Sequence, residues 1–253
     1  MSASAVSIAV FVCAFAGALA GLLIHARLPA SHLEGDSKDV VKLVMGLMAT
    51  LSALVLGLLI SSAHRSYELQ QQEVQTIGIS IFQLDRALER LGPDAKAARE
   101  GLRRIVGAEL ARASARDGIR TAIESPLEAQ HAAAALFDRI AALSPGNDMQ
   151  RIAQQRAMQL LNTLGDTRLL LTEQSRGAIS WPFLVVLTFW LTILFAGFGL
   201  FARTNATVIV SLGLGALSVA GAVFLILEMN RPYTGIMQIS IEPIRSALTQ
   251  MSR

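Results

Sequence analysis

Four long apolar stretches divide the chain, two in its first quarter and two in its last third. They cover residues 6–24, 40–62, 182–201 and 207–227, and they carry almost no charge. Each is close to the roughly 20 helical residues that cross the hydrocarbon core of a bilayer. No Lys or Arg precedes the first stretch, and it is longer than the core of a signal peptide, so we expect a retained helix. The pattern therefore predicts four transmembrane helices.

The segment between the second and third apolar stretches is polar and has helical periodicity. Turn-forming residues at 92–93, 117–118 and 144–146 divide it into four predicted helices, at about 63–91, 94–116, 125–144 and 148–176. Apolar residues in the first of these helices recur every three or four positions, as in a helix with one buried face: Val74, Ile77, Ile81, Leu84, Leu88 and Leu91. Runs of alternating β-branched residues, which would predict strands, do not occur in the sequence.

These elements predict an all-α membrane protein with four transmembrane helices and a helical domain between spans two and three. The expected parts are spans one and two at 1–62, the helical domain at 63–180, spans three and four at 181–230, and a C-terminal tail at 231–253. Composition agrees, because 53% of the residues are hydrophobic, 16% are charged and the mean hydropathy is +0.49.

The distribution of Lys and Arg predicts the orientation in the membrane. With four spans, both termini and the polar middle lie on one side, and that side holds 18 of the 22 Lys and Arg. Arg65, Arg176 and Arg231 flank the spans there. Since positive charge next to spans favours the cytoplasmic side, we expect both termini and the middle domain in the cytoplasm.

Catalytic and cofactor-binding motifs are missing from the sequence. It contains no His-Glu-x-x-His, no phosphate-binding loop and no Gly-x-Ser-x-Gly, its four histidines are scattered, and Cys13 is its single cysteine. A Gly-x-Gly-x-x-Ala run at 197–202 lies inside a span, where it is typical of a close helix contact. The net charge of +3 is small and spread out. We therefore expect neither an enzyme, nor a bound metal or cofactor, nor a nucleic-acid partner.

The second span carries a stripe of small residues on one helical face. The residues recur at intervals of three or four: Gly46, Thr50, Ala53, Gly57 and Ser61. Two interpretations stay open, and they are compatible with each other. Small residues allow helices to pack closely, and they also leave room for water and ions at the lining of a pore.

Two further features lie beyond the membrane spans. In a symmetric ring, Ile77, Ile81 and Leu84 are candidates for a cytoplasmic constriction, although core packing is the more ordinary role of such a stripe. Glu228 and Arg231 end the fourth span three residues apart, so they can pair along one helical face. A carboxylate near a helix C-terminus is disfavoured by the helix dipole, so we expect Glu228 to form an ion pair with Arg231, or with Arg65 or Arg176 on neighbouring helices.

Two stretches carry a resemblance to a known family. LVLGLLISSAHRSYELQQQEV (54–74) joins the second span to the polar middle, and ILEMNRPYTGIMQISIEPIRSAL (226–248) follows the fourth span. Their order resembles the bestrophin-like family of bacterial membrane proteins. The resemblance implies a ring-shaped homo-oligomer, typically a pentamer lined by its second helix, in the bacterial inner (cell) membrane. Asn230 stands where the family pattern has an acidic residue just before the Arg-Pro.

Two functions follow as hypotheses. The first is a homo-oligomeric ion channel-like protein, with the small residues of span two facing the pore and with lipid and ions as its partners. The second is a non-conducting membrane module, whose helical domain binds a partner or relays a signal. An oligomer with a continuous central opening would favour the first.

Overall fold

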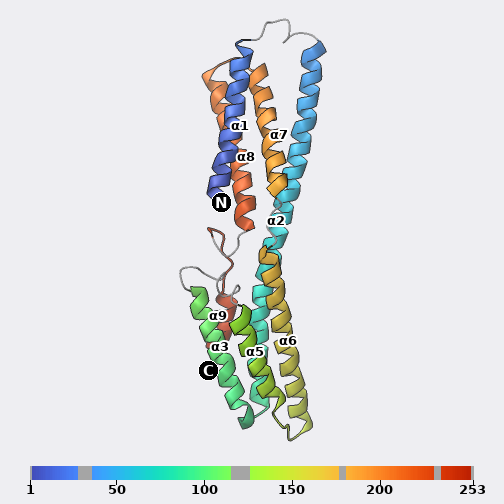
Figure 1. Cartoon of the computed structure of the whole chain (residues 1–253), viewed down its shortest axis with the longest axis vertical. Coiled ribbons are helices and arrows are strands. Elements are labelled where there is room, and N and C mark those ends of the chain that lie inside the picture. Colours follow the sequence, from blue (N-terminus) through green and yellow to red (C-terminus); the bar gives the residue numbers. More distant parts are fainter. Residues whose placement is uncertain (1, 28–35, 115–125, 177–180, 231–234, 252–253) are drawn as a thin grey trace. The chain divides into compact units, whose positions relative to one another are not determined.

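The computed structural model describes residues 2–27, 36–114, 126–176, 181–230 and 235–251. The chain forms two compact units, each built from two separate parts of the sequence. The membrane unit comprises Met1–Arg65 and Ala178–Asn230, and the helical unit comprises Ser66–Gly177 and Arg231–Arg253. The α-helices, which Figure 1 labels, are α1 (Ala3–His25), α2 (Asp36–Arg90), α3 (Lys96–Ser114), α5 (Pro126–Ala141), α6 (Asp148–Arg176), α7 (Trp181–Phe201), α8 (Ala206–Met229) and α9 (Glu242–Met251). A short 3₁₀-helix, η2 (Pro93–Ala95), precedes α3.

The predicted all-α fold is confirmed. Four helices in the described residues, namely α1, α2, α7 and α8, are long and apolar enough to cross a membrane. The second predicted span and the first predicted polar helix are one continuous helix, α2, of 55 residues. Neither Gly nor Pro interrupts the region where they meet, so the backbone hydrogen bonds continue.

The membrane unit is held together by small residues between α1 and α7. A Cβ atom added to Gly17 would lie 2.6 Å from the Thr192 carbonyl oxygen, and one added to Gly21 would overlap the Ala196 carbonyl oxygen. A Cβ atom added to Gly199 would overlap the Ala18 carbonyl oxygen in the same way. The two backbones thus approach closely, as small residues allow in membrane helices. Gly199 belongs to the small-residue run at 197–202, where a helix contact was predicted.

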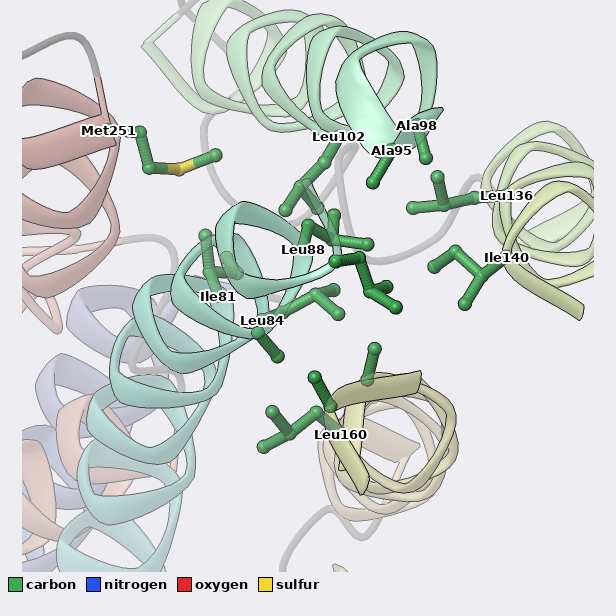
Figure 2. Close-up of a cluster of buried hydrophobic side chains, with 14 of the residues drawn as sticks. Ile81, Leu84, Leu88, Ala95, Ala98, Leu102, Leu136, Ile140, Leu160 and Met251 are labelled. Carbon is green, nitrogen blue, oxygen red and sulfur yellow. The ribbon is translucent and has the colours of Figure 1, made fainter. Parts of the chain in front are cut away.

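The main apolar core of the helical unit receives side chains from α2, α3, α5, α6 and α9. A smaller cluster in the same unit joins Val74, Leu171 and Ile239. Figure 2 shows side chains from these helices converging on Leu84 and Leu88, which are 0% and 1% exposed. After α2, Gly92 turns the chain with a φ of +88°, a conformation that favours glycine. Pro93 then begins the short helix η2. The predicted break at 92–93 therefore lies where the structure turns the chain.

A buried carboxylate joins α2 to α3. Asp85, whose side chain is 2% exposed, accepts two hydrogen bonds from the Arg99 guanidinium, at 2.6 Å from Nε and 2.7 Å from Nη2. Arg103 Nε lies 4.0 Å from the same carboxylate. The hydrogen bond to Asp85 raises the pKa of Arg99, against the opposite effect of burial. Two cations facing one carboxylate compensate its burial.

The C-terminal helix α9, within the predicted tail at 231–253, is part of this core. Ala247 and Met251 are buried among the other core residues. The Arg103 guanidinium donates a hydrogen bond to the Met251 carbonyl oxygen. Gly78 of α2 faces the start of α9 closely, because an added Cβ atom there would lie 2.8 Å from the carbonyl group of Pro243.

Candidate channel-lining site

The inner face of α2 in the membrane unit packs against the other spans. Met48 and Ala49 contact the cluster around Ala14, Ala18 and Phe195, and Leu56 contacts a second cluster around Val10 and Val223. Ser52 shares this inner face and is 4% exposed. No hydrogen-bond partner for its hydroxyl group lies among the described residues. Sequence reasoning missed Ser52, because nothing in the sequence marks which face of α2 points inward.

The small-residue stripe lies on another side of α2 and is exposed at all five positions, Gly46, Thr50, Ala53, Gly57 and Ser61. A Cβ atom added to Gly46 or to Gly57 would meet no described atom within 4 Å. The Thr50 hydroxyl donates to the Gly46 carbonyl oxygen at 2.9 Å, within the same helix. The described part of the chain therefore does not use this stripe for its own helix packing.

A third side of α2 presents large aliphatic residues. Leu43, Leu47, Leu54 and Leu58 are 59–76% exposed. Side chains of this kind match the hydrocarbon chains of a bilayer, whereas a stripe of Gly, Ala, Thr and Ser leaves backbone and hydroxyl oxygen atoms accessible. The two exposed sides of α2 thus suit different surroundings.

The constriction candidates lie in the helical unit. Ile81 and Leu84 are 6% and 0% exposed and belong to its core. Ile77 is half-buried and packs against that core. This burial agrees with the core-packing interpretation of the stripe. Of the three, Ile77 is the residue with a partly accessible side chain.

Of the predicted pair Glu228 and Arg231, the structure describes Glu228. Glu228 lies in the last turn of α8 and is 5% exposed. Asn230 caps this helix, because its side-chain amide donates to the Ile226 carbonyl oxygen at 2.8 Å. Arg231 lies outside the described residues, so the ion pair with Glu228 stays a prediction. A carboxylate this buried at the end of a span requires a compensating charge or hydrogen bond.

The described residues offer little chemistry of other kinds. They contain no group of three or more His, Cys, Asp or Glu side chains placed to hold a metal ion. Cys13 is exposed on α1. The feature with functional potential in the membrane unit is therefore the exposed small-residue stripe of α2.

Comparison with known proteins identifies a family profile and a solved structure that are similar to this chain. The profile of the bestrophin-like domain matches residues 12–244. The fold is similar to the crystal structure of a single-substitution variant of a bacterial bestrophin homolog from Klebsiella pneumoniae, with a TM-score of 0.68 and 14% sequence identity. That match covers 97% of this chain and 98% of the other. A search of curated proteins gave no match. Because the family profile spans nearly the whole chain, this membrane protein belongs to the bestrophin-like family.

Proposed function

We propose that the chain assembles with copies of itself into an ion channel of the bestrophin type, with the small-residue stripe of α2 lining the pore. The observation that carries this proposal is that all five residues of the stripe are exposed and that both of its glycines face open space. Membership of the bestrophin-like family supports it.

The chemistry of α2 favours a pore over lipid contact for the stripe. The adjacent leucines already provide a surface for hydrocarbon chains. Small side chains leave space along an axis, and the oxygen atom of Thr50 or Ser61 can accept a hydrogen bond from water. Closely packed neighbouring copies are compatible with this lining, because small residues at its edge let helices approach.

The remaining parts of the proposal concern the orientation and the pore entrance. The protein lies in a bacterial inner membrane and the assembly is a pentamer, as the family resemblance suggests. The termini and the helical unit face the cytoplasm, as the distribution of Lys and Arg suggests. Ile77 borders the cytoplasmic pathway. Glu228 and Arg231 form an ion pair that fixes the end of α8 at the cytoplasmic mouth.

Ion flux into liposomes tests the pore lining. Purified wild-type protein should carry Cl⁻ or Na⁺ into liposomes, and Gly57→Leu should strongly reduce this flux. Gly221→Leu is the matched control, because Gly221 is an exposed glycine of α8 whose added Cβ atom would also meet no described atom. Native mass spectrometry of each variant shows whether the oligomer is intact.

The result also separates the alternatives. Equal flux through Gly57→Leu and wild type would exclude the pore assignment of the stripe. An absence of flux through the wild type would favour the non-conducting module, in which the stripe serves contacts between copies and the helical unit binds a partner.

A further inference from the structure

A groove with a hollow of about 320 Å³ lies between α3 and α5 in the helical unit. The hollow exists because the facing positions of the two helices carry very small residues, Gly101 and Ala108 on α3 and Ala132 and Ala135 on α5. Ile105 contributes apolar surface to the same lining. The groove therefore has an apolar floor of limited size, at the lower end of the roughly 300–1,000 Å³ of small-molecule pockets.

The lining is also positively charged. It contains three arginines and one carboxylate, Glu109. Both oxygen atoms of that carboxylate are already paired, with Arg112 Nη2 at 2.8 Å and with Arg168 Nη2 of α6 at 3.0 Å. Glu109 thus leaves the charges of the other two lining arginines uncompensated.

Those two arginines are Arg104 of α3 and Arg139 of α5, both exposed. Among the described side chains, no carboxylate oxygen lies within 4.0 Å of either guanidinium group. Arg139 reaches across to α3, where a Cβ atom added to Gly101 would lie 3.6 Å from its Nη1. Two guanidinium groups that have no carboxylate partner among the described residues therefore flank the apolar floor.

We propose that this groove binds a small organic anion, with a carboxylate or phosphate group between Arg104 and Arg139 and an apolar body against Ile105 and Leu136. A guanidinium group offers paired donors that match the geometry of both anions. The apolar part of the ligand removes floor area from water. The site lies in the helical unit, and its occupancy does not depend on ion conduction by the α2 stripe.

Phenyl phosphate is the probe for the test, titrated against the full chain in nanodiscs of zwitterionic lipid and followed by ligand-observed NMR. Benzyl alcohol supplies the apolar body alone, and inorganic phosphate supplies the anion alone. We expect phenyl phosphate to bind at least about tenfold more tightly than either. Removing one guanidinium, as in Arg104→Gln or Arg139→Gln, should weaken its binding roughly tenfold.

Two further variants complete the test. Gly101→Met should abolish binding, because its side chain would occupy the hollow, where its Cβ atom makes ordinary contacts with Arg139 and Leu136. Arg151→Gln, on the exposed surface of α6, should leave binding unchanged.

Unchanged affinity in Arg104→Gln, Arg139→Gln and Gly101→Met would overturn the proposal. Equal affinity for inorganic phosphate and phenyl phosphate would also overturn it, because it would indicate a diffuse surface charge. A change in subunit number in the charge variants without ligand would assign the groove to contacts between copies instead.

Discussion

Gly78→Ala should loosen the docking of α9, although alanine is the better helix former. In a helix interior the substitution by itself adds about 1 kcal/mol of stability. At this position, however, the new Cβ atom would lie 2.8 Å from the carbonyl carbon and oxygen of Pro243 and 2.9 Å from its Cβ atom. Backbone atoms cannot rotate away, so the start of α9 has to move.

The magnitude follows from what α9 buries. Overpacking of this kind typically costs about 1–3 kcal/mol. Moving α9 also exposes part of Met251, whose full burial contributes about 1.5–3 kcal/mol. The same movement weakens the hydrogen bond from Arg103 to the Met251 carbonyl oxygen. After subtraction of the helix-propensity gain, we expect the docking of α9 to weaken by about 2 kcal/mol, a factor of roughly 30.

Hydrogen exchange measured by mass spectrometry on the full chain in nanodiscs reports this docking directly. Amides of Glu242–Met251 should exchange about 30-fold faster in Gly78→Ala than in wild type. Gly107→Ala in α3 is the matched control, because its added Cβ atom would meet no described atom within 4 Å. That control should raise thermal stability and leave exchange in α9 unchanged. If Gly78→Ala behaves like the control, the close contact with Pro243 is not part of the folded protein.

Two other substitutions test the packing of each unit. Asp85→Asn should lower the free energy of unfolding of the helical unit by about 2–3 kcal/mol, because it leaves the Arg99 guanidinium without its charged acceptor. Urea denaturation followed by circular dichroism measures this free energy. Asp148→Asn, which removes a charge from an exposed pair, should change it by less than about 0.5 kcal/mol. Gly199→Ala should separate α1 from α7 and lower the thermal stability of the membrane unit, whereas Gly221→Ala should not; equal midpoints for the two glycine variants would contradict the close contact.

Periodicity and turn residues were enough to predict the helices, because those signals are local. The apolar spacing around Leu84 and Leu88 follows from one buried face, and Gly92 followed by Pro93 marks a turn through its own backbone conformation. The four spans follow in the same way from their length and apolar composition.

Pairings between distant residues could not be predicted from the sequence. Asp85 is an ordinary polar residue of a helix in the sequence, and its burial depends on an arginine that approaches only after the chain turns at Gly92. The start of α9 lies close to Gly78, which is more than 160 residues earlier in the chain. No local pattern encodes such a partner.

The small-residue stripe of α2 shows the same difference between local signals and contacts with distant residues. Its existence on α2 was predictable from spacing, but which small residues pack within the chain was not. The structure uses Gly17, Gly21 and Gly199 for that purpose and leaves Gly46 and Gly57 open. The flux and native mass spectrometry measurements on Gly57→Leu test the proposed function of this stripe.

The discontinuity of both units has a consequence for biogenesis. The helical unit needs α9, and α1 needs α7 and α8 as packing partners, so neither unit is complete until both late spans have been synthesised. During translation the core residues around Leu84 and Leu102 are therefore synthesised before α7 and α8, and their partner Met251 is synthesised after them. Closure of the helical core therefore follows synthesis of α7 and α8, and we expect a nascent chain stalled before α8 to expose apolar surface, which favours aggregation.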